Sequence, residues 1–435
     1  MIPAPRCYFL LLLGVALALL LAIFINQQVG ILGTLFYDGI VLSLTFADAQ
    51  RVKSHRVEVF RLPLERLSIG RDNPVRFFVK AGNKKAKIRI RDYYPIAFKV
   101  SSPSLQATLA RNSTEELTYQ VYPDSRGEFE WGDIQVRQLG QWGLAWHDWK
   151  IPTSQKVSVY PDLAGLRSLS IRLTLQSTGT MRQLRRLGMG TEFAELREYG
   201  QGDDLRAIDW KATARHGRPL VRVLEPDREQ TLIILLDRGR LMTAQVQGLK
   251  RFDWGLNATL SLALAGLHRG DRVGVGVFDR ATTTWIPPER GQQQLFHLIE
   301  RLTPIQSVLL EPDYMGAVTK VVNEQTRRAL VVLITDIVDA TASAELLAAM
   351  KRLTPRYLPF CVTLRDPQVD AIAHTPSDNI KTAYARAVAL DLLEQCQVAF
   401  AQLKQKGVLV LDAPANKISE QLVDRYLQLK ARNLL

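Results

Sequence analysis

The 435-residue chain contains little cysteine and lacks the short motifs of several enzyme classes. Its three cysteines, Cys7, Cys361 and Cys396, lie far apart, which excludes a disulfide framework and a zinc site built on closely spaced cysteine pairs. This usage is typical of a reducing compartment. No Gly-Lys-Ser/Thr follows the glycine pairs at 188–190 and 200–202, so neither is a P-loop.

The other absences also argue against an enzyme. No Gly-x-Ser-x-Gly nucleophile elbow is present, and the six histidines lack metal-ligand spacing. The formal net charge is +13, yet no RNP motif or arginine–aromatic ladder accompanies it. We therefore expect a protein that is not an enzyme and binds no nucleic acid. An enzyme of another class, or a binder of anionic lipid or nucleic acid, has only the net charge in its favour.

Two apolar stretches near the N-terminus predict a membrane hairpin in residues 1–53. Residues 8–25 contain 18 residues without a charge, close to the ~20 that cross a bilayer core. Residues 31–47 form a weaker second stretch with Asp38 near its middle. A carboxyl at that depth is either costly or faces the other helix.

The flanking charges predict the orientation of this hairpin. Arg6 precedes the first stretch, basic residues at 51–56 follow the second, and the link at 26–30 has no positive charge. The positive-inside rule places both ends in the cytoplasm. A cleaved signal peptide is the alternative, but the first apolar run is long for one and lacks an Ala-x-Ala-like cleavage site.

Residues 54–162 have the period-two pattern of short strands. Apolar and polar residues alternate in 57–62, 75–81, 87–92, 96–101, 117–123 and 156–161. This predicts a small antiparallel β-sandwich. Four tryptophans crowd its end, and packing in the core or at an edge is favoured over a ligand-stacking platform. They are Trp131, Trp142, Trp146 and Trp149.

The last two regions are a charged connector and an α/β domain. The connector, residues 163–229, mixes both signs, and all its basic residues except Lys211 are arginines, which suit bidentate pairing with carboxylates. In residues 230–435 apolar strands alternate with helical segments, which predicts a mostly parallel sheet covered on both faces. The strand at 282–287 follows a short turn, so we expect it to be the antiparallel edge.

Two aspartates close predicted strands of this sheet, Asp237 the first and Asp336 the fourth. Ligands of open α/β sheets bind beyond the carboxyl ends of the strands, and such oxygens suit Mg²⁺. A strand ending in Asp and a later one ending in Thr-Asp resemble a von Willebrand factor A domain. The resemblance implies a doubly wound sheet.

Residues 190–237 contain Glu195, Arg197 and Tyr199, followed by Gly-Asp-Asp at 202–204 and Ile-Asp-Trp-Lys at 208–211. This stretch closely resembles the signature of a bacterial family, domain of unknown function 58. The N-terminal part is similar to that family's layout too, with Arg126-Gly127 and Trp142-Gly143-Leu144 in the β-rich region. We expect the signature to bind a partner or, alternatively, to form a buried salt-bridge network that holds the connector on the A-like domain. The residues proposed for this role are Glu195, Arg197, Tyr199, Asp203, Asp204, Arg206, Asp209, Trp210, Lys211 and Arg215.

The resemblance implies a location and a class of partner. The resemblance implies that members of this family are partners of MoxR-type AAA+ ATPases, often in assemblies with other A-domain proteins. Together with the hairpin, this predicts a multi-pass protein of the bacterial cytoplasmic membrane whose soluble domains face the cytoplasm. The expected function is that of a membrane-anchored, non-enzymatic adaptor.

The A-domain metal motif, Asp-x-Ser-x-Ser with a Thr from a second loop and a further Asp, is only partly present. Gly239 and Leu241 stand where the hydroxyls belong, and the second loop offers Glu311 and Asp313. Arg238 and Arg240 flank Asp237, and a guanidinium can satisfy that carboxylate instead of a cation. We therefore expect no cofactor. Mg²⁺ at Asp237 and Asp336 is the alternative, and it implies a cation-dependent, adhesion-type module.

Overall fold

The computed structural model describes residues 2–24, 27–64, 66–187, 192–200, 203–225, 230–337, 343–376 and 379–432. Residues 1–160 form one compact unit and residues 161–435 another. The predicted hairpin and the predicted β-rich region therefore belong to one unit, which ends within two residues of the expected boundary.

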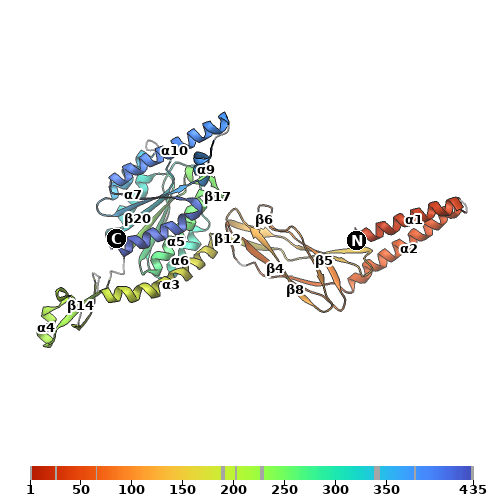
Figure 1. The fold of residues 1–435 in the computed structure, drawn as a ribbon, viewed down its shortest axis with the longest axis horizontal. Helices are drawn as coiled ribbons and strands as arrows, with labels where there is room; N and C mark the ends of the chain where they lie inside the picture. Colours follow the sequence, from red (N-terminus) through yellow and green to blue (C-terminus); the bar gives the residue numbers. More distant parts are fainter. Residues whose placement is uncertain are drawn as a thin grey trace. The chain divides into compact units, whose positions relative to one another are not determined.

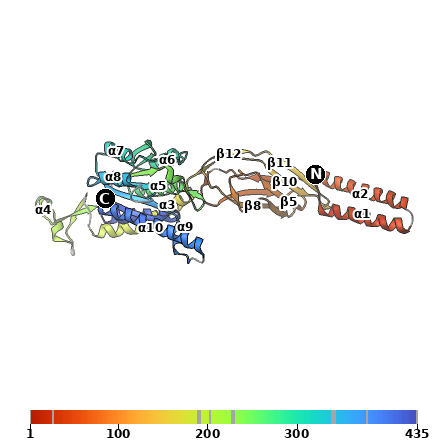
Figure 2. The same cartoon turned by 90° about the horizontal axis from the view of Figure 1, so that it is seen from above.

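The first unit begins with two helices that lie side by side, α1 (Pro5–Phe24) and α2 (Gln27–Lys53) (Figures 1 and 2). Both are long and apolar enough to cross a membrane. Their apolar side chains are mostly exposed, as lipid-facing residues are. Asp38 faces the other helix, because a Cβ atom built on Gly14 would lie 2.9 Å from its Oδ1. Of the two alternatives for this carboxyl, a costly exposed position or one that faces the other helix, the structure has the second.

The end of α2 is fastened to the β-strands by Asp48, which is fully buried. Its Oδ1 accepts the backbone N–H of Trp142 at 3.1 Å, and its Oδ2 accepts that of Leu144 at 3.0 Å. The turn also passes close to the helix, since a Cβ atom on Gly140 would lie 2.1 Å from the carboxylate. The Trp-Gly-Leu element of the family layout therefore attaches the hairpin to the β-region.

The strands of this unit form three sheets, with the orders β1-β11-β10-β5-β7, β3-β12-β9 and β2-β4-β8-β6. Alternate residues of β4 and β5 are buried, as the period-two pattern predicts. All pairings are antiparallel except that of β3 with β12, which is parallel and corrects the all-antiparallel expectation. The strands are β1 (Ile2–Pro3), β2 (Glu58–Arg61), β3 (Arg66–Ser68), β4 (Asn73–Lys80), β5 (Ala86–Asp92), β6 (Lys99–Val100), β7 (Leu105–Leu109), β8 (Thr114–Tyr122), β9 (Gly127–Trp131), β10 (Ile134–Leu139), β11 (Ala145–Ile151) and β12 (Gln155–Tyr160).

The tryptophans pack in the core or at an edge, as favoured from the sequence. Trp131 is fully buried and donates its Nε1–H to Asp92 at 3.0 Å. The other three each have an arginine within cation–π distance of the ring, for example Arg51 at 4.3 Å from the centroid of Trp142. An arginine side chain thus lies over each of the rings that a ligand platform would need.

The second unit is built on one six-stranded sheet with the order β19-β18-β15-β20-β21-β22. Five strands run parallel, and β19 pairs with β18 in the antiparallel sense, which confirms the predicted edge strand. The strands are β15 (Thr231–Asp237), β18 (Arg272–Phe278), β19 (Thr282–Glu289), β20 (Leu330–Thr335), β21 (Leu358–Arg365) and β22 (Leu409–Pro414). A small hairpin of β16 (Gln245–Val246) and β17 (Leu249–Lys250) lies outside this sheet.

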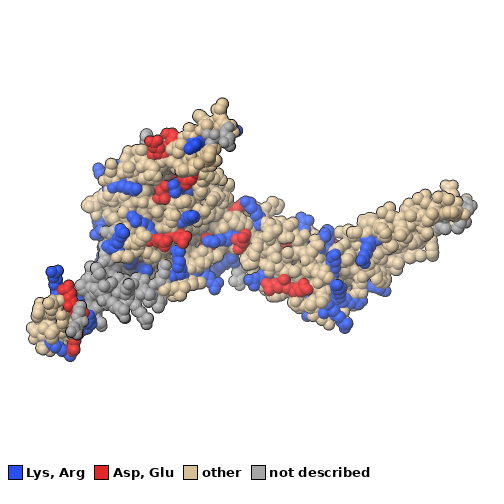
Figure 3. Space-filling model, viewed as in Figure 1, with Lys and Arg blue, Asp and Glu red and all other residues tan. Residues whose placement is uncertain are grey.

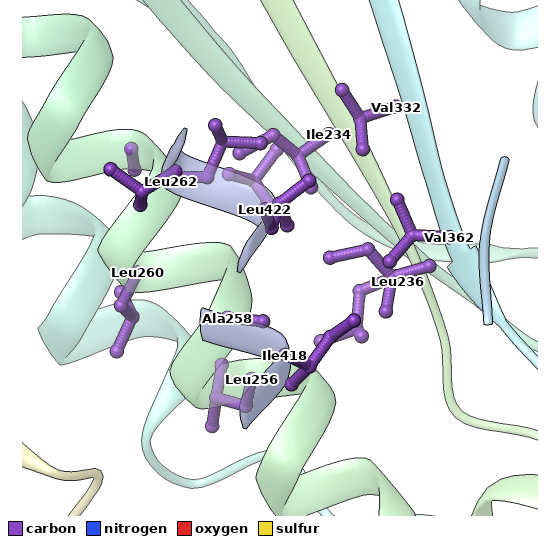
Figure 4. Packing of buried hydrophobic residues seen from close by; sticks show 14 of the residues in the cluster. Ile234, Leu236, Leu256, Ala258, Leu260, Leu262, Val332, Val362, Ile418 and Leu422 are labelled. Carbon is purple, nitrogen blue, oxygen red and sulfur yellow. The ribbon is translucent and has the colours of Figure 1, made fainter. Parts of the chain in front are cut away.

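Helices pack on both faces of this sheet, as expected for near-continuous apolar strands. Ile234 and Leu236 belong to one buried cluster, which packs against α5 and α11 (Figure 4). Ile233 and Leu235 belong to another, on the side of α7, α8 and α10. The helices are α5 (Arg251–His268), α6 (Gln292–Leu302), α7 (Tyr314–Glu324), α8 (Ala344–Leu353), α9 (Pro367–His374), α10 (Ile380–Gln405) and α11 (Ile418–Ala431).

The predicted connector is more regular than its mixed charge suggested. It begins with a long helix, α3 (Leu163–Leu187), whose Leu166 and Leu173 join the cluster around α5. Next comes an antiparallel pair, β13 (Glu192–Glu198) and β14 (Leu220–Glu225), with the short helix α4 (Trp210–His216) between them. We call residues 192–225 the signature arm.

Candidate functional site

The carboxyl end of β15 holds Asp237, which has no exposed surface. Its Oδ2 accepts hydrogen bonds from the Thr335 hydroxyl at 2.7 Å and the Tyr314 hydroxyl at 3.3 Å. Its Oδ1 accepts the backbone N–H of Gly239 at 2.7 Å. Burial raises the pKa of Asp237, against the effect of these donors. Neutral donors from three segments therefore satisfy this carboxylate.

Asp336 lies next to the end of β20 and is paired with Arg251, the first residue of α5. The guanidinium Nη1 is 2.5 Å from Oδ2 of Asp336, and both side chains are largely buried. Burial raises the pKa of Asp336 to about 6, and the charge of Arg251 opposes this rise. A cation supplied by the chain itself thus neutralises the second carboxylate.

The structure corrects the expectation that a guanidinium of Arg238 or Arg240 satisfies Asp237. Both arginines pair with other carboxylates. Arg238 Nε donates to Asp279 at 2.8 Å, and Arg240 Nε donates to Glu311 at 2.6 Å. Backbone bonds between residues 238–240 and 308–310 direct these side chains to other loops.

We call the end of the sheet at which the parallel strands terminate the carboxyl edge. These contacts leave it poorly suited to Mg²⁺. Asp313, the other carboxylate of the second loop, accepts the N–H of Gly316 and caps α7. Within the described residues, no three His, Cys, Asp or Glu side chains lie close enough together to hold a metal. Hydroxyl protons and a guanidinium point at the oxygens that a cation would need.

We expect no heat of binding when Mg²⁺ or Mn²⁺ is titrated into the purified full-length protein, because each carboxylate already has donors of its own. Isothermal titration calorimetry checks this. The Arg251→Ala variant is the matched control, since it alone leaves Asp336 without its cation. Saturable heat from the wild type at millimolar metal contradicts the expectation.

The signature arm is held together by its own ion pairs. Arg197 donates from both terminal nitrogens to Asp203, at 2.9 and 2.6 Å, and Arg222 donates to Asp209 at 2.6 Å. The hydrogen bond from Arg197 lowers the pKa of Asp203, and that from Arg222 lowers the pKa of Asp209. Each pair joins two residues of the arm itself.

The acidic signature residues also cap the short helices of the arm. Asp209 accepts the backbone N–H groups of Lys211 and Ala212 at the start of α4, and Asp204 accepts that of Arg206. Satisfied N-caps give the loop between β13 and β14 a defined shape. Glu195 lies in β13, opposite Val223 of β14.

Several signature side chains remain exposed although the backbone around them is well bonded. Trp210 is 70% exposed and Tyr199 37%. Leu205, which the sequence analysis did not select, is 65% exposed. Arg206, Lys211 and Arg215 are exposed as well. Acidic and basic side chains lie among them on the arm (Figure 3). Ordered backbone with exposed aromatic and apolar side chains is the pattern of a contact surface.

The comparisons with known proteins agree with the family resemblance. The family model "Protein of unknown function DUF58" matches residues 195–380, which include the arm after its third residue and the sheet as far as β21. Over this stretch the chain is similar to the DUF58 family.

Two relatives are uncharacterized bacterial proteins. The uncharacterized protein Rv1480 of Mycobacterium tuberculosis is 26% identical over 151 residues, which are 34% of this chain and 48% of that protein. The uncharacterized protein YeaD of Bacillus subtilis is 27% identical over 109 residues, 25% of each chain. The matched segment thus spans about half of the first relative and a quarter of the second.

One solved structure matches about half of this chain. It is the crystal structure of the conserved hypothetical protein BatB from Bacteroides thetaiotaomicron, which is 16% identical and matches 47% of this chain and 99% of its own. The TM-score is 0.33.

Proposed function

We propose that this protein is a membrane-anchored, non-enzymatic adaptor, and that its signature arm binds a cytoplasmic protein partner. The α1–α2 hairpin anchors the chain, with both of its ends on the cytoplasmic side of the bacterial membrane. The partner is a MoxR-type AAA+ ATPase, which the family resemblance implies, and other A-domain proteins join the assembly.

The exposure of Trp210 and Leu205 on the signature arm is the observation that carries this proposal. Burying a large aromatic side chain at an interface contributes more than burying most other residues, and tryptophan is enriched among energetic hot spots. Because Asp209 caps the helix that begins at Trp210, the backbone at this residue is already ordered, and little backbone entropy is lost when a partner covers it. The arm is therefore preorganised for binding.

We propose further that the sheet of residues 230–435 is of the von Willebrand factor A kind and serves as a scaffold. The strand order, the single antiparallel edge strand, and the aspartates beside the ends of β15 and β20 support this assignment. The carboxyl edge is closed by Arg251, Thr335 and Tyr314, so on this proposal the domain binds without a metal.

The test is co-purification of the tagged full-length protein from gently solubilised membranes, with and without ATP. We expect a AAA+ ATPase to be recovered in a nucleotide-dependent manner. Trp210→Ala is expected to lower its recovery at least tenfold, which corresponds to about 1.4 kcal/mol of binding free energy. Phe296→Ala is the matched control, because Phe296 is also an exposed aromatic residue, 63% accessible, on α6 outside the arm.

Two results count against the proposal. Recovery of no ATPase from the wild type removes the support for this class of partner. Equal losses for Trp210→Ala and Phe296→Ala show that the partner binds elsewhere. Melting curves of both variants, matched to the wild type, show whether a loss reflects binding or folding.

A further inference from the structure

Helix α10 carries an exposed row of large side chains on its N-terminal half. Ile380, Tyr384 and Val388 are spaced four residues apart and are 89%, 74% and 44% exposed. Leu392 continues the row at 37%. Such i, i+4 rows form the ridges by which helices pack against one another. Nothing in the proposed adaptor role accounts for this ridge.

The ridge leads into a cavity. Its last member, Leu392, lines a hollow of about 190 Å³ beside the carboxyl ends of β20, β21 and β22. Leu393, Cys396 and Phe400 of α10 form much of the apolar wall, and Ile337, Leu364 and Val369 from other elements complete it. The paired Arg251 and Asp336 lie at its polar side. A hollow of this size accepts a large side chain from outside.

Small residues beside the ridge allow another helix to approach closely. Ala383 and Ala387 form the neighbouring row on one side and are exposed, as is Ala385 on the other. Ridges of i±4 spacing pack into such grooves when two helices cross at about −50°, with axes about 8–10 Å apart. The surface is therefore shaped for a second helix with the same kind of ridge.

We infer that a second copy of this chain covers the ridge, with two α10 helices crossing in opposite directions at Val388. Of the other ridge residues, Tyr384 and Leu392 lie equally far from Val388, four positions on either side of it. A two-fold axis through Val388 places Tyr384 of each copy over Leu392 of the other, at the mouth of the cavity. Each copy thus offers the side chain that the other's hollow accepts, which is the self-complementarity of an isologous dimer.

The charges along α10 agree with the antiparallel direction. Near the ridge, the basic residue Lys381 precedes Val388 and the acidic residue Asp391 follows it. When the helices run in opposite directions, the positive half of one faces the negative half of the other. Parallel helices would place like charges together and would also align their dipoles unfavourably. An amphipathic helix of another protein is the competing occupant, and the experiments distinguish it from a second copy.

Cysteine cross-linking of the full-length protein in membranes tests the axis. Val388→Cys is expected to form a disulfide-linked dimer on mild oxidation, because facing Cα atoms at the crossing come within the roughly 4.4–6.8 Å that a disulfide spans. Leu390→Cys is the matched control: this residue is similarly exposed, at 45%, but lies on another side of α10. The wild type, oxidised in the same way, shows whether the three native cysteines form a cross-link by themselves.

Three results overturn the inference: absence of a Val388→Cys dimer, equal yields at 388 and 390, or a cross-linked product whose mass includes a different protein. Light scattering of the detergent-solubilised full-length protein gives an independent measurement. The wild type is expected to be a dimer, and Tyr384→Glu to raise the dissociation constant at least tenfold, while Leu390→Glu leaves it unchanged. The inference is also overturned if the wild type is a monomer at tens of micromolar and the melting temperatures of all the proteins are alike.

Discussion

Replacing Arg251 with methionine is expected to destabilise residues 161–435 by about 3 kcal/mol at pH 8. Arg251 and Asp336 are paired at 2.5 Å with little solvent access, so the substitution leaves a buried carboxylate without its counter-charge. For a unit of this size the loss corresponds to a fall of roughly 6–12 °C in melting temperature. Thermal unfolding of the purified full-length protein at a fixed scan rate measures it.

The stability lost by the Arg251→Met variant is expected to become smaller as the pH falls. The pKa of Asp336 is about 6 in the folded protein and 3.8 ordinarily, so the folded state holds this proton more tightly than the unfolded chain. The group therefore favours folding below pH 3.8, and this contribution is lost as the pH rises through 6. Without Arg251 the folded pKa rises further. The variant should accordingly differ less from the wild type at pH 5 than at pH 8.

Two further variants separate charge from packing. Arg251→Lys keeps a positive charge near Asp336 and is expected to lose less stability than Arg251→Met. The double variant Arg251→Met/Asp336→Leu removes the orphaned carboxylate and is expected to recover most of the loss, because replacing both partners of a buried pair is often nearly neutral. A loss that is the same at both pH values, or a double variant no better than the single one, contradicts this account of the carboxyl edge.

The second large effect is expected at Asp48, where the membrane hairpin joins the β-strands. Asp48→Ala leaves the backbone N–H groups of Trp142 and Leu144 without their acceptor in a partly buried turn. Each unpaired group costs about 1–3 kcal/mol. We expect the turn at residues 140–144 to open and to become a site of proteolytic cleavage, while the second unit retains its melting temperature.

Limited proteolysis of the full-length protein in detergent, with the cleavage sites identified by mass spectrometry, measures this opening. Asp48→Asn keeps one carbonyl oxygen as an acceptor and should be intermediate. Gln50→Ala, a change at an exposed position of the same helix, is the control. Cleavage of Asp48→Ala and Gln50→Ala at equal rates shows that the carboxylate does not hold this turn.

Local patterns were sufficient for much of this architecture. Long apolar runs predicted α1 and α2, alternation predicted β4 and β5, and continuous apolar runs predicted the parallel strands. These features depend on residues close in the chain, and hydrophobic periodicity reports them directly. The connector was harder: α3 has Leu166 and Leu173 on one side, but its many charges obscured the helical period.

The carboxyl edge shows the same division between sequence and tertiary structure. Because parallel strands end at one edge of a sheet, the sequence by itself placed Asp237 and Asp336 near each other, and the missing hydroxyls at 239 and 241 indicated an altered metal motif. It also supplied the family signature that the comparisons match. The partners of the carboxylates were not predictable, since Thr335 lies 98 residues beyond Asp237 and Arg251 begins a different helix. Which donor reaches a buried carboxylate depends on how distant segments pack, and only the tertiary structure decided that hydroxyls and a guanidinium close this edge.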